Sequence, residues 1–172
     1  FGRQVGATEE LWQLALGGAE PQRLLGGDGA LYRDPAHSPC GRFLAYAVAP
    51  AEQPTRIQLL DLRSGVRTVL PAPSELRDAA LLRPAWSPAA DRLFFEATQG
   101  EEVAVWVQEL ASGRCVRLTP PGGRERRPAP LSPELLVVER DREDGTSDLA
   151  LLALDEALAV ARTRRLVGRA RS

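Results

Sequence analysis

A short proline-bounded segment occurs three times in the chain and restricts the folds it can adopt more than any other feature. The best copy reads RPAWSP at residues 83–88, and residues 34–41 read DPAHSPCG. A looser copy, RPAPLSPELLVVER, occupies residues 127–140. A run of strand-forming residues follows each copy. One such segment would be a turn, whereas three in one chain indicate an internal repeat.

A second motif follows at a matching distance: a strand that ends in leucine, a turn that usually holds glycine, and another strand. Periods of this length with short strands predict β-propeller blades of four antiparallel strands each, so the predicted fold class is all-β. Residues 148–167 have high helix propensity, but their alignment with the other copies predicts strands. The strand-ending leucines are Leu16, Leu62, Leu110 and Leu154, which are 46, 48 and 44 residues apart.

The prolines of the segment limit where strands can pair. Proline cannot donate to a ladder, so Pro84 and its equivalents must lie at strand ends or where no partner needs the amide. Trp86 is expected to fill the wedge between neighbouring blades, and Ser87 to cap the following turn. His37 stands where Trp86 stands in its own copy, which predicts a packing role for it.

At these residues the sequence resembles the TolB-type propeller repeat, a relative of WD repeats. RPAWSP matches that pattern but continues without its Asp-Gly turn, and His37 and Cys40 replace its tryptophan and aspartate in the earlier copy. The later part matches closely at residues 139–155. The resemblance implies a propeller, typically of six blades, that is often extracytoplasmic or periplasmic, bacterial, and works through protein partners.

The chain reads as one domain of about three and a half blades. Closed propellers usually have four to eight blades. We therefore expect a part of a larger propeller, an association of copies into a homo-oligomer, or an open sheet with exposed edges. The expected units are a half blade at residues 1–25, contributing two outer strands, and blades at about 30–71, 78–119 and 127–167.

Composition excludes several classes of function. The net charge of −1 argues against electrostatic attraction to nucleic acid or to an anionic membrane. The sequence contains no run of 18 apolar residues, so no membrane span is predicted. Cys40 and Cys115 have neither zinc-site nor redox-motif spacing and are expected to be free thiols. We predict no metal and no cofactor.

Three other features of the sequence indicate structural roles rather than catalytic, metal-binding or phosphate-binding ones. His37 is the only histidine and no G-x-S-x-G motif is present, so no catalytic triad is predicted. DREDGTSD at residues 141–148 places glycine too early for an EF-hand loop, which predicts a turn between the second and third strands of its blade. The arginine-rich residues 162–171 predict an outer strand followed by a tail rather than a phosphate site.

The sequence predicts a non-catalytic binding or scaffold module for a protein or peptide partner. The connecting segments at 49–55, 71–82 and 120–127 are expected to rim the two faces of the propeller. One alternative is the gating propeller of a prolyl oligopeptidase-like hydrolase, and another is the sensor part of a larger regulator. The expected partner-binding residues are Arg77, Arg124 and Arg126.

Overall fold

The structure is a computed structural model that describes all residues except 16, 19, 143, 156 and 167–172. It confirms the all-β prediction, because fifteen strands and a single 3-10 turn, Ser74–Leu76, make up the regular structure of the described residues. Nothing helical in that part of the chain has the length and apolar character needed to cross a bilayer.

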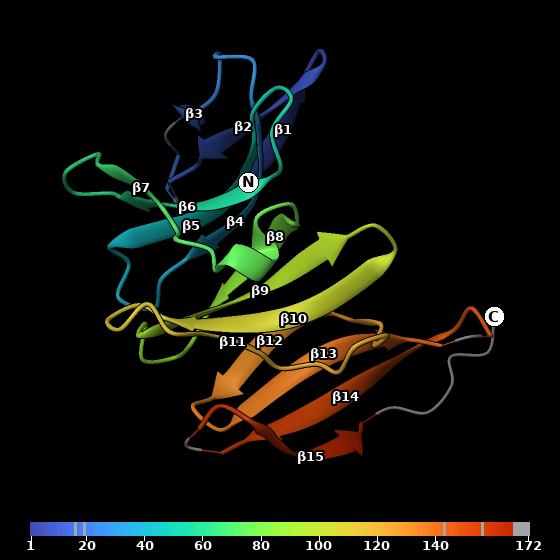
Figure 1. Ribbon diagram of the computed structural model, residues 1–172. Helices are drawn as coiled ribbons and strands as arrows, with labels where there is room; N and C mark the ends of the chain where they lie inside the picture. The colour runs from blue at the N-terminus through green and yellow to red at the C-terminus, as the bar shows by residue number, and fades with distance from the viewer. Residues whose placement is uncertain (16, 19, 143, 156, 167–172) are drawn as a thin grey trace.

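Three four-stranded antiparallel blades lie side by side in Figure 1. Blade I contains β4 (Leu31–His37), β5 (Phe43–Ala49), β6 (Arg56–Asp61) and β7 (Arg67–Val69). Blade II contains β8 (Ala80–Trp86), β9 (Arg92–Gln99), β10 (Glu102–Glu109) and β11 (Cys115–Arg117). Blade III contains β12 (Glu125–Ser132), β13 (Leu135–Asp141), β14 (Ser147–Leu154) and β15 (Val160–Arg165). The last two strands confirm the strand prediction for residues 148–167, the segment with high helix propensity. Arg169 and Arg171, in the expected tail, lie outside the described residues.

The N-terminal sheet differs from the expected pair of strands, because it has three. These are β1 (Gly2–Val5), β2 (Thr8–Gln13) and β3 (Gln22–Leu25). A tight hairpin at Gly6, whose φ is +61°, adds β1 without the proline signal that marks the other units. One parallel bridge between Glu9 and Leu31 joins this sheet to β4. Within the described chain the other edge of β1 has no strand partner, so the expected exposed edge is present.

Each inner strand contains a proline at a β-bulge. The register shifts between Arg33 and Ala36 in β4, and between Leu82 and Ala85 in β8. A proline amide is not needed at such a shift, which agrees with the prediction. The prolines are Pro35, Pro84 and Pro128, and the residues before them, Asp34, Arg83 and Arg127, have φ values of +53°, +49° and +51°.

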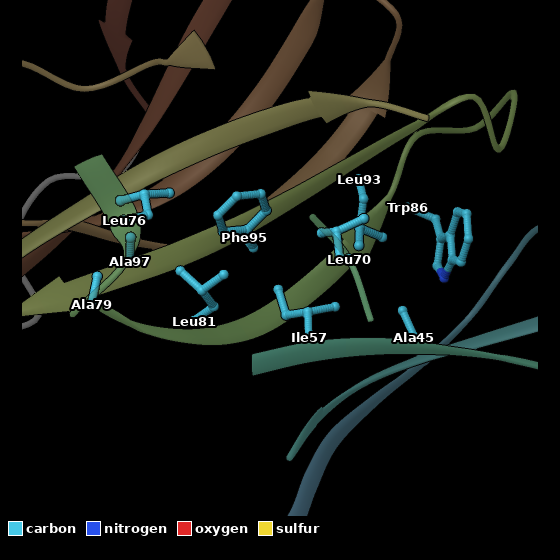
Figure 2. Close-up of a cluster of buried hydrophobic side chains, with 10 residues drawn as sticks. All are labelled: Ala45, Ile57, Leu70, Leu76, Ala79, Leu81, Trp86, Leu93, Phe95 and Ala97. Atoms are coloured by element: carbon cyan, nitrogen blue, oxygen red, sulfur yellow. The ribbon is translucent and has the colours of Figure 1, made fainter. Parts of the chain in front are cut away.

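Apolar side chains fill the space between the blades. Trp86 is 7% exposed and packs in the cluster between blades I and II, as predicted (Figure 2). Its indole Nε1 donates to the backbone oxygen of Ala36 at 2.9 Å, and its ring stacks on Phe43. The corresponding cluster between blades II and III contains Phe94, Val105, Val107, Leu118, Leu136, Val138, Ala150, Leu152, Leu154 and Leu158.

The serine of each Ser-Pro pair caps the turn that follows it, as predicted for Ser87. Its hydroxyl oxygen accepts from the amide of Arg92 at 3.0 Å, and Ser38 accepts from Phe43 at 2.9 Å. The fourth residue of the turn has a left-handed backbone, with φ of +69° at Gly41 and +58° at Ala90. Blade II therefore holds an alanine where blade I uses glycine.

Gly41→Ala is expected to lower the free energy of unfolding by about 1 kcal/mol, because an alanine there must adopt left-handed φ. A Cβ at this position meets no atom within 4 Å, so the loss comes from the backbone alone. Urea melts of Gly41→Ala and Gly41→Asn check this prediction. The asparagine variant should lose less, since asparagine tolerates this conformation, and equal losses would show that the backbone is not the cause.

Candidate functional site

The connections between strands fall on two faces because the strands of each blade alternate in direction. We call the face that carries the links between blades the crossover face, and the other the turn face. The crossover face contains residues 50–55, 70–79, 100–101 and 118–124 and the β13–β14 connection. The turn face contains residues 38–42, 62–66, 87–91, 110–114 and 133–134.

The three variable segments were expected to rim both faces, and this expectation is wrong. The connections β5–β6, β7–β8 and β11–β12 all lie on the crossover face. Two contacts show it: the amide of Leu81 donates to the oxygen of Thr55 at 3.0 Å, and the amide of Gly122 donates to Glu102 at 3.4 Å. Two strands, β6 and β7, separate the first of these connections from the second, and four strands, β8 to β11, separate the second from the third. An even number of antiparallel strands returns the chain to the same side.

Blade III is hollowed at the crossover face. The hollow has a volume of about 530 Å³, and a second hollow of about 250 Å³ lies toward blade II. Gly123, Arg124 and Asp141 line both, so the two are continuous. The larger one is lined by Gly122, Gly123, Arg124, Glu125, Arg140, Asp141, Arg142 and Asp144.

A buried carboxylate supports the floor of the larger hollow. Glu125 is 4% exposed, and its Oε1 accepts from Arg140 Nε at 2.8 Å. Its Oε2 is buried without a hydrogen-bond partner among the described atoms. A Cβ on Gly123 would lie 2.3 Å from this oxygen and 2.9 Å from the backbone oxygen of Pro120, so a larger residue would force the loop to shift. The 118–124 connection therefore covers Glu125 tightly.

A second carboxylate anchors the other end of this connection. Glu102 Oε1 accepts from Arg117 Nη2 at 2.6 Å and also from the amide of Gly122. These interactions, with that from Arg117 the largest, hold the pKa of Glu102 below its usual value. Glu102 therefore stays ionised and holds the loop that presents Arg124.

The predicted partner-binding arginines have different surroundings. Arg124 is exposed, and no ion pair of the described residues includes it. Arg77 is also exposed and without an ion pair in that part of the chain, although its backbone oxygen accepts from Arg56 Nη2. Arg126 is half-buried and pairs with Asp141 at 2.6 Å and Glu139 at 3.6 Å. Arg77 and Arg124 are thus free to meet a partner, whereas Arg126 belongs to the wall.

The acidic segment 141–148 forms a turn between β13 and β14, as predicted. Asp144 Oδ1 accepts from the amide and hydroxyl of Thr146 at 3.0 and 2.6 Å. Asp148 is 8% exposed and pairs with Arg142 and Arg165. Local arginines and hydroxyls thus occupy these oxygens, and the described residues contain no group of three His, Cys, Asp or Glu that could hold a metal.

His37 is exposed, so its expected packing role is wrong. The equivalent Trp86 is covered by β4 of the preceding blade, whereas the N-terminal sheet has no inner strand to cover His37. A hollow of about 230 Å³ remains, lined by His37, Phe1 and Leu44 among others. The neighbouring hydroxyl of Ser38 is occupied by its turn.

The two cysteines are free, as predicted. Cys40 is exposed, and a hydrogen bond from the Ser38 hydroxyl lowers the pKa of its thiol. Burial raises the pKa of Cys115 to about 12. The two thiols lie in different blades, and their pKa values are shifted in opposite directions.

Solved structures similar to this chain include TolB proteins and other propeller proteins. Putative TolB from Agrobacterium tumefaciens superposes with a TM-score of 0.73 at 17% identity, covering 95% of this chain and 58% of that one. TolB from Acinetobacter baumannii gives 0.71 at 22% identity, covering 94% and 38%. A chain from a structural and mechanistic analysis of two prolyl endopeptidases gives 0.64 at 14% identity, covering 94% and 24%.

No protein-family model matches the sequence, and a search of curated proteins finds no match. The chain spans about three fifths of the Agrobacterium protein and less of the others. At these identities the likeness establishes the fold. The chain has the TolB-type β-propeller fold, in partial form, as the resemblance of its repeat implied.

Proposed function

We propose that the chain is a non-catalytic propeller module that holds a protein or peptide partner on its crossover face. The observation that carries this proposal is the placement of Arg77 and Arg124. Both are exposed guanidinium groups without an ion pair in the described chain, on neighbouring connections of one face. Rigid sheets that display variable loops in this way suit recognition of a partner.

The hollow beside Arg124 favours an acidic segment of the partner. Arg140 and Arg142 in its wall are already neutralised by Glu125 and Asp148. Arg124 is the guanidinium left for a new charge-assisted hydrogen bond, which a carboxylate can accept in bidentate form. Arg126 contributes through its ion pairs, which fix the wall. The likeness to TolB also supports a bacterial, extracytoplasmic setting.

A gating propeller of a prolyl oligopeptidase-like hydrolase is the second candidate. Its support is the structural likeness to one prolyl endopeptidase chain, of which this chain covers 24%. The reading frame around this chain discriminates the two candidates, since a gating propeller requires a hydrolase segment with G-x-S-x-G in the same gene.

Affinity capture from an extract of the encoding organism tests the binding proposal. Arg124→Ala should weaken binding of the captured partner by about 10-fold to 100-fold, the loss expected for one charge-assisted hydrogen bond. Arg63→Ala removes an exposed arginine from the turn face and should leave binding unchanged. Loss of binding in Arg63→Ala but not in Arg124→Ala would place the partner on the turn face and would contradict the proposal. Peptide or ester turnover that vanishes in His37→Ala would defeat the non-catalytic assignment.

A further inference from the structure

Each of the three blades has a hollow at the same position of its crossover edge. The hollows of blades I, II and III have volumes of about 430, 240 and 530 Å³. Each is lined by the second-strand residue that pairs with the position three residues before the proline of the inner strand. These equivalent residues are Val48, Ala97 and Arg140. The three hollows are therefore repeats of one feature, and the charges that line them can be compared.

The blade II hollow lacks a cation that the blade I hollow contains. In blade I the guanidinium of Arg67 lines the hollow. Arg67 is the first residue of β7 and Cys115 is the first residue of β11, so the two positions are equivalent. Burial and, to a smaller extent, the nearby Glu75 carboxylate raise the pKa of the Cys115 thiol to about 12. Blade II therefore has a neutral thiol close to a carboxylate where blade I has a guanidinium.

Two carboxylates line the blade II hollow. Arg117, the basic residue among the described residues that line it, pairs with Glu102 at 2.6 Å. Glu75 comes from the link between blades I and II, is exposed, and has no ion pair within the described chain. The hollow is thus left with the negative charge of Glu75 uncompensated.

The rest of the lining suits the apolar stem of a long basic side chain. Ala79, Ala97 and Ala104 are buried and line the hollow with small side chains. The half-buried Trp106 also lines it, and the face of an indole ring attracts cations more strongly than any other side-chain ring. A long basic side chain can bury its methylene groups against such a wall while its charged end meets a carboxylate.

The indole of Trp106 has no partner of its own in the described part of the chain. Arg3 lies over the Trp12 ring, whereas no described arginine lies over Trp106. The Nε1 groups of Trp12 and Trp86 donate to acceptors at 3.0 and 2.9 Å, and no described acceptor receives the Nε1 hydrogen of Trp106. Both the ring and its N–H group are therefore available to a bound molecule.

We propose that the blade II hollow binds the basic side chain, arginine or lysine, of the segment held on the crossover face. This inference rests on the proposed function and adds a second charge to the partner. The charged end of the side chain pairs with Glu75, and its stem packs on Trp106 and the alanines. Because Arg124 favours an acidic residue, the preferred segment carries both a basic and an acidic residue.

The hollow can be tested without the partner, because the probe is a single side chain. Nα-acetyl-arginine methylamide is titrated into the 172-residue chain while NMR follows the indole N–H resonance of Trp106, assigned with Trp106→Phe. We expect a saturable shift with a Kd on the order of 1 to 10 mM. The neutral citrulline analogue of the probe should bind at least about fivefold more weakly. No shift, or equal binding of the two probes, would overturn the proposal.

Two matched variants locate the site of binding. Glu75→Gln should weaken binding of the arginine probe by about 3-fold to 10-fold. Glu101→Gln removes an exposed carboxylate from the same face, outside the blade II hollow, and should leave binding unchanged. Equal losses in the two variants would assign the attraction to the overall charge of the face and would overturn the proposal.

The captured partner separates this proposal from the proposed function. Weaker partner binding in both Glu75→Gln and Arg124→Ala supports the two together. Weaker binding in Arg124→Ala alone would overturn the role of the hollow and leave the proposed function standing. Probe binding that depends on Glu75, combined with a partner that neither variant affects, would support a basic side-chain site and contradict the proposed function.

Discussion

Trp86→Ala is expected to lower the free energy of unfolding by about 3 to 5 kcal/mol, the loss for a large aromatic side chain in a packed core. The indole lies between blades I and II in a cluster of buried apolar side chains (Figure 2), and its removal would leave a cavity there. The substitution also leaves the backbone oxygen of Ala36 without its donor. Denaturant melts followed by circular dichroism measure the loss.

His37→Ala is the matched control, because His37 has the same repeat position in the preceding blade. Its side chain is exposed, so the variant should stay within about 0.5 kcal/mol of the parent. The two stability losses are compared at the same position of the repeat. A larger loss for Trp86→Ala shows that the energy comes from the neighbouring inner strand that covers Trp86, and not from the repeat motif itself. Equal losses would mean that Trp86 is not a wedge between blades.

Glu96→Ala is expected to lower the free energy of unfolding by about 3 kcal/mol, since it removes a buried carboxylate from its ion pair with the half-exposed Arg83 and leaves the amide of Arg127 without its acceptor. Glu96 is 1% exposed and binds Arg83 Nη1 at 2.5 Å. It also accepts from the amide of Arg127, so one carboxylate ties the inner strand of blade II to that of blade III. Equilibrium unfolding in urea measures the effect.

Glu139→Ala provides the control for this position. Its carboxylate pairs with Arg127 as Glu96 pairs with Arg83, but its side chain is 20% exposed and no backbone amide of the described residues donates to it. The variant should therefore lose about 1 kcal/mol or less. A loss as large as that of Glu96→Ala would show that the contact between blades contributes nothing.

The repeat allowed the strands and the core to be predicted, because its proline and leucine spacing marks where each strand begins and ends. Trp86 and Ser87 could be assigned because their roles depend on the motif itself. The environment of His37 depends instead on a strand that the N-terminal sheet lacks. No motif reports that absence, so the same position packs in one blade and is exposed in another.

The contacts that shape the candidate site depend on tertiary structure. Arg126 and Arg124 look alike in PGGRERRP, yet one pairs with Asp141 across the sheet and the other is free. The role of Glu96 could have been predicted, because it is a single acidic residue inside the apolar strand RLFFEATQ. A carboxylate buried in such a strand requires a hydrogen-bond or ion-pair partner. The placement of all three variable segments on one face also followed from strand parity and could have been deduced.

Hydrogen exchange of the partner-bound chain tests most directly whether the module works through its crossover face. Binding should slow the exchange of amides in residues 118–124 and 70–79, where Arg124 and Arg77 lie, and leave residues 87–91 and 110–114 unchanged. Protection confined to those two turn-face segments, with the crossover connections exchanging as in the free chain, would contradict the account.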